Sequence, residues 1–368
     1  MNFRTFLLIG QGVLLAAHCF LYFTAARFFR ITSPGYRIAL GCLLAFLSVS
    51  FLLASYVAHM QESPFTRAFY IFGGVWLGTS LSLLMAAIAA WLIVLPAGLA
   101  GYGIRRELVG GALLCLALAY SAYGVWNAFH PQVKNVQVTI KNLPESWKGR
   151  TIVQLSDVHL GHVFRAGFLK RIVGMVNSLH PDMVVITGDL FDGMDGALPE
   201  LAGPLKDLHA PYGIYFVTGN HETYLGVDKV YPIMKEAGVT VLNDEVRELD
   251  GLQLAGISYP QRGQTKVAGN VLKSIPGFVP GRPTVLLYHA PVGIDAARAA
   301  GVSLQLSGHT HKGQIFPFGY ITSKMYDGYD YGLHTIGDYS IYTSDGAGAW
   351  GPPMRTGNTP EIVDIQLD

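Results

Sequence analysis

The chain has 368 residues, of which 51% are apolar and only 14% are charged, and its formal net charge is +1. Soluble domains carry about 25% charged residues, so part of this chain must avoid water. The near-neutral charge comes without a cluster of Lys and Arg, which excludes a protein that binds nucleic acid mainly through phosphate contacts. We therefore expect no nucleic acid among its partners.

The first 130 residues consist of long apolar segments that lack charged side chains. They cover residues 5–26, 38–60, 70–100 and 108–129. A hydrocarbon core of about 30 Å needs about 20 apolar residues in a helix, so each segment is long enough to cross a membrane. Pro96 and Gly98 predict that the third segment ends or kinks near its C-terminus. We expect an N-terminal anchor of about four transmembrane helices at residues 1–130 and a second domain at residues 131–368.

Basic residues in the short loops predict how these helices cross the membrane. Arg27, Arg30 and Arg37 lie between the first two segments, and Arg105 and Arg106 lie between the last two. Because short basic loops stay in the cytoplasm, we expect a multi-pass cell-membrane protein whose large domain faces outward, into a periplasm or the extracellular space.

From residue 136 onward, short apolar strands alternate with amphipathic helices. Strands are predicted at 136–140, 151–155, 183–186, 214–217, 239–242, 284–288 and 303–306, and helices at 168–179 and 227–237. Alternation of this kind indicates an α/β domain.

Polar clusters follow five of these strands. They are Ser156-Asp157-Val158-His159, Gly188-Asp189-Leu190-Phe191-Asp192, Gly219-Asn220-His221-Glu222, Tyr288-His289-Ala290 and Gly308-His309-Thr310-His311. Residues two apart in an extended chain point the same way, so Asp157 and His159 can reach one centre. Carboxylate, imidazole and amide ligands suit divalent Mn, Fe or Zn, with Mg, Ni and Co as further candidates. Each cluster alone is also compatible with turn chemistry or core packing, but all five in this order indicate a metal site, in which Asp189 can bridge two ions.

This order of motifs resembles the calcineurin-like metallophosphoesterase superfamily, and the resemblance covers residues 136–368. The run Gly-His-Thr-His-Lys-Gly-Gln-Ile-Phe-Pro from Gly308, with Pro352-Pro353-Met354-Arg355 and Pro360-Glu361-Ile362, is similar to a membrane-associated bacterial branch. That branch includes phosphodiesterases and an enzyme that cleaves the pyrophosphate of a UDP-linked diacylglucosamine. The resemblance implies a four-layer α/β/β/α sandwich.

The resemblance also implies roles for individual residues. The first metal ion would be held by Asp157, His159, Asp189 and His311, and the second by Asp189, Asn220, His289 and His309. His221 matches the catalytic histidine, Asp192 would orient a ligand, and Glu222 stands where the family often has Asp.

These patterns predict a membrane-anchored phosphoesterase with two divalent metal ions. It would hydrolyse a phosphodiester, pyrophosphate or phosphomonoester by attack of a metal-bridging hydroxide. Its expected partners are membrane lipid and a phosphorylated small molecule or lipid, with a lipid-linked or envelope substrate as one option. The alternative is a catalytically inactive membrane sensor or scaffold with the same fold.

Three features have less definite roles in the sequence. His162 either lines the site or lies exposed in a loop, and Arg355 is a candidate ligand for a phosphate oxygen. The aromatic segment 316–342 forms either a wall for lipid or sugar, or ordinary packing under a long loop.

Overall fold

The computed structural model describes residues 3–193, 196–261 and 263–368, and these form two compact units. The first unit comprises Met1–Trp126 with Gly351–Thr356, and the second comprises Asn127–Trp350 with Gly357–Asp368.

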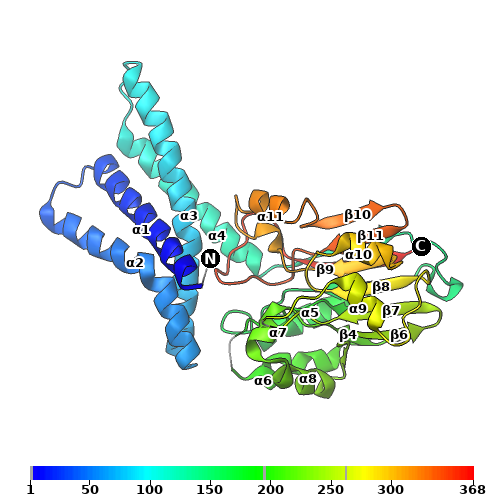
Figure 1. Ribbon diagram of the computed structural model, residues 1–368. Coiled ribbons are helices and arrows are strands. Elements are labelled where there is room, and N and C mark those ends of the chain that lie inside the picture. The colour runs from blue at the N-terminus through cyan, green and yellow to red at the C-terminus, as the bar shows by residue number, and fades with distance from the viewer. Residues whose placement is uncertain (1–2, 194–195, 262) are drawn as a thin grey trace. The chain divides into compact units, whose positions relative to one another are not determined.

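The first unit contains four long helices. They are α1 (Phe3–Phe28), α2 (Pro34–Met60), α3 (Pro64–Leu99) and α4 (Arg106–Ala128), drawn in blue to cyan in Figure 1. Each is long and apolar enough to cross a membrane, so the described residues contain four candidate spans, the number that the sequence predicts. Helix α3 begins earlier than predicted because Ser63 and Thr66 form a reciprocal cap, in which the Thr66 N–H donates to Ser63 Oγ at 3.1 Å and the Ser63 N–H donates to Thr66 Oγ1 at 2.9 Å.

The hexapeptide Gly351–Thr356 packs against α3 and α4, although it lies far beyond residue 130 in the sequence. Glycines on the two helices make room for it: a Cβ atom at Gly78 would lie 2.8 Å from the sulfur of Met354, and one at Gly74 would lie 3.0 Å from Pro353. The N–H of Arg355 donates to the carbonyl of Gly124 at 2.8 Å. Small residues thus let this segment approach the helix backbones closely.

Two six-stranded sheets form the centre of the second unit. The first has the order β1-β12-β2-β3-β4-β5 and the second the order β10-β11-β9-β8-β7-β6. The strands of the first sheet are β1 (Gln132–Val138), β2 (Thr151–Leu155), β3 (Met183–Ile186), β4 (Ile214–Phe216), β5 (Thr240–Val241) and β12 (Glu361–Leu367). Those of the second are β6 (Glu245–Leu249), β7 (Leu252–Ile257), β8 (Thr284–Tyr288), β9 (Leu304–Ser307), β10 (Gly332–Ile336) and β11 (Tyr339–Thr343).

Helices cover the outer face of each sheet. One core joins the first sheet to α5 (Ala166–Ser178), α6 (Leu198–Ala202) and α8 (Val227–Glu236), and another joins the second sheet to α9 (Ala268–Ser274) and α10 (Ile294–Ala299), which lie over β7, β8 and β9 in Figure 1. A third core lies between the sheets, where Val185 and Val363 of the first sheet belong to the same cluster as Leu254 and Leu287 of the second. The four-layer α/β/β/α sandwich is therefore confirmed.

Parallel pairing brings the polar loops to common edges. Strands β2, β3 and β4 are parallel neighbours in the first sheet, and β8 and β9 are parallel neighbours in the second. The carboxyl ends of parallel strands meet at one edge of a sheet, where α/β proteins place their ligands. The loops after these five strands carry every residue that the sequence predicts to bind metal.

Candidate metal centre

The ligand loops have an unusual backbone conformation. Asp157, His159, Asp189, His309 and His311 all have φ between 48° and 75°. The sequence-based expectation that Asp157 and His159 point the same way in extended chain is therefore wrong in its local geometry. Left-handed backbone is uncommon for residues other than glycine and costs free energy, so the surrounding packing must hold these loops in place.

Two glycines are required by close approach of other loops. A Cβ atom at Gly219 would overlap the carboxylate of Asp189, and one at Gly308 would overlap Ser156 and the carboxylate of Asp157. Gly219 therefore lets the loops after β3 and β4 of the first sheet approach each other, and Gly308 lets the loop after β9 meet the loop after β2 of the other sheet.

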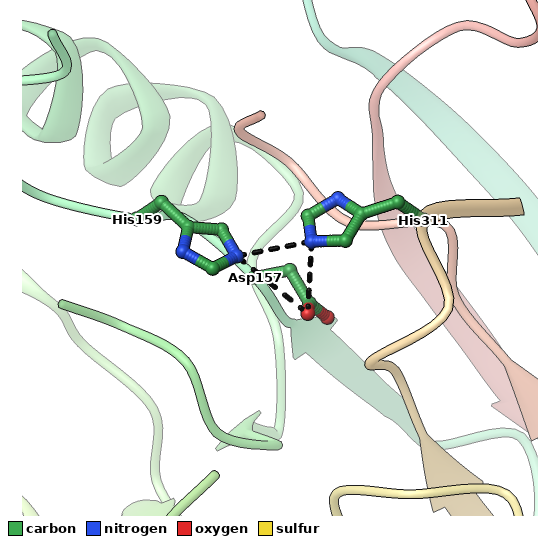
Figure 2. Close-up of side chains that lie close together, drawn as sticks. All are labelled: Asp157, His159 and His311. Carbon is green, nitrogen blue, oxygen red and sulfur yellow. Dashed lines mark hydrogen bonds and ion pairs between the residues drawn. The ribbon is translucent and has the colours of Figure 1, made fainter. Parts of the chain in front are cut away.

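Asp157, His159 and His311 form the first group of potential ligands (Figure 2). The Nε2 atoms of the two histidines lie 3.0 Å apart, and Asp157 Oδ1 lies 3.4 Å from Nε2 of His311 and 3.9 Å from Nε2 of His159. A cation with ligands at about 2.1 Å holds neighbouring ligand atoms roughly 3.0 to 3.4 Å apart. Two of the three separations fall in this range and the third is 0.5 Å longer, so the three atoms converge on one space that a cation could occupy.

A second group comprises Asp189, His289 and His309. Asp189 Oδ2 lies 3.2 Å from Nε2 of His289, and that nitrogen lies 3.2 Å from Nδ1 of His309. The same carboxylate oxygen lies 4.0 Å from Nε2 of His159, a member of the first group. Asp189 is therefore placed between the two groups.

The residue types of the site fit divalent cations. The Oδ1 atom of Asn220 is buried and accepts no hydrogen bond from the described residues, which is costly for an amide oxygen unless it has another partner. Nδ1 of His289 lies 2.8 Å from the carbonyl of Thr187, so it carries the proton and leaves Nε2 free to bind a metal ion. Asp192 Oδ1 lies 3.4 Å from Nδ1 of His159, as expected for a residue that orients this ligand.

Burial and the charges of neighbouring ligands shift the pKa values of the site in opposite directions. Burial opposes ionisation of Asp189, but its attraction to His289 and other histidines holds its pKa well below the ordinary range. Burial disfavours protonated His289, yet the carboxylate of Asp189 outweighs this and raises the pKa of His289 to about 10. Burial, reinforced by repulsion from His289, lowers the pKa of His309 to about 3. A cation at this position would compete with a proton for Nε2 of His289, because both are attracted by the carboxylate of Asp189.

His221 stands beside the two groups with one ring nitrogen directed to the backbone. Its Nδ1 donates to the carbonyl of Asp192 at 2.9 Å, which leaves Nε2 unprotonated and 3.9 Å from Asp189 Oδ2. Burial lowers the pKa of His221. His221 also forms a third group of potential metal ligands with His159 and Asp189. Its position therefore allows two roles, contact with the substrate or binding of a metal ion.

Glu222 holds the ligand loops together, a role that the sequence reasoning missed. Its Oε2 accepts the N–H of Asp189 at 2.9 Å and the N–H of Gly219 at 2.7 Å, and its Oε1 accepts the N–H of Phe191 at 3.1 Å. Burial, followed by repulsion from Asp189, raises the pKa of this carboxyl to about 7. One buried side chain thereby fixes the loops after β3 and β4.

Removal of this carboxylate is expected to destabilise the second unit. In Glu222→Ala three buried N–H groups lose their acceptor, at about 1 to 3 kcal/mol each, so we expect the midpoint of thermal unfolding to fall by about 10 °C. Glu222→Gln keeps one acceptor oxygen, so its midpoint of thermal unfolding should lie between those of Glu222→Ala and the parent protein. Glu236→Ala, on the exposed surface of α8, is the control and should melt close to the parent. A Glu222→Ala protein that melts with the control would show that these bonds contribute little.

Aromatic rings surround the candidate ligands. The ring of Tyr259 lies 5.7 Å from that of His289, and the ring of Tyr326 lies 6.1 Å from that of His309. Tyr224 and Trp350 approach His221 at 5.4 and 6.0 Å, and both are more than half exposed. Of these four rings, only Tyr326 belongs to the aromatic segment noted in the sequence.

The remaining sequence candidates have definite positions. His162 is buried, which excludes the exposed alternative. Tyr339 and Tyr342 of the aromatic segment are packed in β11, whereas Phe316, Phe318 and Tyr320 are exposed. Arg355 is buried within the helical unit, and its role toward phosphate stays a prediction.

Comparison with known proteins agrees with the geometry of the site. The profile of the calcineurin-like phosphoesterase family matches residues 150–313, which include every candidate ligand. An uncharacterized metallophosphoesterase of Campylobacter jejuni is 35% identical over 277 residues, covering 72% of this chain and 71% of the relative. The chain belongs to the calcineurin-like metallophosphoesterase family.

Other relatives of this metallophosphoesterase come from animals and from further bacteria. A zebrafish transmembrane protein with a metallophosphoesterase domain is 35% identical over 280 residues, and the match covers 72% of this chain and 63% of the zebrafish protein. An uncharacterized metallophosphoesterase of Bacillus subtilis (strain 168) is 33% identical over 281 residues, covering 72% of this chain and 97% of the relative. The chain thus spans less than two thirds of the zebrafish relative but nearly all of the one from Bacillus.

Proposed function

We propose that this metallophosphoesterase is a membrane-anchored hydrolase that cleaves a phosphodiester, pyrophosphate or phosphomonoester with two divalent metal ions. The observation that carries the proposal is the position of Asp189 between two groups of buried ligands, with Oδ2 3.2 Å from His289 and 4.0 Å from His159. A carboxylate in that position can bridge two cations. Asp157, His159 and His311 would hold one cation, and Asn220, His289 and His309 the other.

The bound cations would neutralise charge on the phosphoryl oxygens and activate a water molecule. The mixed oxygen and nitrogen ligands favour Mn, Fe or Zn. The protein's own contribution is positional, because Glu222 and the glycines at 219 and 308 hold the ligand loops against each other before substrate binds.

We assign to His221 the protonation of the leaving group. Its Nδ1–H is fixed by the carbonyl of Asp192, so Nε2 is the nitrogen that exchanges a proton with substrate. The imidazolium form would donate that proton to the departing oxygen, which makes an alkoxide leaving group easier to expel. Tyr224 and Trp350, which are exposed next to His221, would flank the leaving group.

A lipid-linked substrate is supported by exposed apolar residues beside the site. The short helix α11 (Gly319–Met325) and the residue before it carry exposed apolar side chains, namely Phe318, Tyr320, Ile321 and Met325. The residue after this helix, Tyr326, contacts the ring of His309. Apolar side chains of this size favour an apolar neighbour over water, and an acyl chain would supply one.

We further propose a multi-pass cell-membrane protein whose catalytic domain faces the periplasm or the extracellular space. The support is the arginine content of the loops at residues 29–33 and 100–105 and their flanks, which favours the cytoplasmic side.

The test of the function is a substrate panel assayed with the purified full-length protein. We expect turnover of aryl phosphodiesters, loss of this activity on chelation, and recovery when Mn²⁺, Fe²⁺ or Zn²⁺ is restored. A protein that binds metal but turns over no phosphate ester or anhydride would support the inactive sensor instead.

Within the panel, a lipid-linked phosphodiester in detergent should have a higher kcat/KM than a soluble aryl diester. Equal values would remove the argument for lipid.

A further inference from the structure

A basic cavity lies at one end of the helical unit, among residues that no catalytic role involves. Its volume is about 580 Å³. The charged part of its wall comes from Arg27 in the last turn of α1, Arg30 in the turn after α1, Arg37 in the first turn of α2, and Arg106 at the start of α4. Four arginines therefore line one space.

The charge of this cavity is mostly uncompensated. Arg30 pairs with Glu107 at 2.5 Å, and Arg37 Nε donates to the carbonyl of Ile31 at 2.7 Å. The side chains of Arg27 and Arg106 form no hydrogen bond or ion pair with the part of the chain that the structure describes, and the described lining residues include no carboxylate. Guanidinium groups bind phosphate oxygens through paired N–H donors, so the space suits a phosphate.

Apolar hollows adjoin the basic cavity on two sides of α1. One, of about 170 Å³, shares Phe28 with it and is otherwise lined by residues such as Leu44 and Leu113. The other, of about 190 Å³, shares Tyr22 and Phe23 with it and also borders Leu44. A charged space bordered by two apolar ones matches a molecule with one anionic head and two hydrocarbon chains.

We propose that the arginine cavity, defined by Arg27, Arg30, Arg37 and Arg106, binds the phosphate of an anionic glycerophospholipid whose acyl chains occupy the two apolar hollows. Helices α1, α2 and α4, whose ends line the cavity, are each long and apolar enough to cross a bilayer, so the cavity would lie at the level of the lipid headgroups. A zwitterionic lipid brings its own cation to the arginines and should bind more weakly. This site is separate from the hydrolase assignment, because it involves none of the candidate metal ligands.

The test is native mass spectrometry of the full-length protein in detergent with dioleoyl phosphatidylglycerol, where the mass of the complex also shows that the bound lipid is intact. We expect one tightly held phosphatidylglycerol, and about tenfold weaker retention of dioleoyl phosphatidylcholine. Arg106→Gln should lower the affinity for phosphatidylglycerol about tenfold. Arg105→Gln is the matched control, because it removes the same charge from the adjacent residue, which does not line the cavity.

Three outcomes would overturn the proposal. Equal losses in Arg106→Gln and Arg105→Gln would mean that only diffuse attraction acts, and equal retention of the two lipids would remove the role of the arginines. Displacement of the lipid by millimolar glycerol 1-phosphate would indicate a site for soluble phosphates.

Arg27→Gln provides a second variant if Arg106→Gln fails to fold. Both variants should hydrolyse a soluble aryl phosphodiester at the parent rate, so a failure of the catalytic assignment would be seen separately.

Discussion

Asp189→Asn is expected to lower kcat/KM for an aryl phosphodiester by at least about 1000-fold, because in the proposed centre this one carboxylate serves both cations. The amide that replaces it has one oxygen acceptor in place of two and no charge. Nε2 of His289, 3.2 Å from Asp189 Oδ2, would also lose its anionic neighbour. We expect the metal content of the purified variant to fall below two ions per chain, as measured by inductively coupled plasma mass spectrometry.

Asp192→Asn is the matched control for this substitution. Asp192 follows the same strand but approaches Nδ1 of His159, the nitrogen that faces away from the other ligands, at 3.4 Å. Removal of a residue that orients a ligand typically costs 10- to 100-fold, so we expect a loss of about that size. Equal effects of the two variants would argue that Asp189 has no special position, and full activity with two ions in Asp189→Asn would exclude a bridge.

His221→Gln is expected to lower kcat by about 100- to 10,000-fold for an ester with an alkyl leaving group, since proton donation to the leaving oxygen is lost. The loss should be much smaller for a p-nitrophenyl ester, whose leaving group departs without a proton. Metal content should stay at the parent value, because the proposed role of His221 is toward the substrate and each proposed metal site has its ligands without it.

The same variant separates the two roles that the geometry of His221 allows. Its Nε2 lies 3.9 Å from Asp189 Oδ2, close enough for a share in metal binding. If His221→Gln loses an ion and shows equal losses with both leaving groups, His221 is a ligand and the assignment to the leaving group is wrong. His209→Gln, an exposed position on the same unit that belongs to none of the motifs, controls for the loss of an imidazole.

The sequence predicted the elements whose signal is local. Charge-free runs of more than 20 residues mark α1 to α4, and the predicted strand at 284–288 coincides with β8. The clustering of candidate ligands also followed from the sequence, because parallel strands bring their carboxyl ends together wherever they stand in the chain. The sequence shows Glu222 only as a residue that stands where the family often has Asp. Its three backbone partners depend on how two loops fold against each other.

Features set by distant contacts were beyond the sequence. The left-handed backbone of Asp157 and His159 lies in a loop that packs against Gly308, after a strand of the other sheet, and no local pattern reports it. The rings of Tyr259 and Trp350 come from two separate connections, so nothing in their own neighbourhoods indicates that they face the histidines. The hexapeptide Gly351–Thr356 joins the helical unit only because glycines on α3 and α4 leave space for it.

The central claim is that two cations share the carboxylate of Asp189. The most direct measurement is a crystal structure of the protein grown with Mn²⁺, with anomalous differences collected at the manganese edge. We predict two peaks about 3.5 to 4 Å apart, with Asp189 between them, Asp157, His159 and His311 around one, and Asn220, His289 and His309 around the other. A single peak, or two peaks that do not both contact Asp189, would contradict the account.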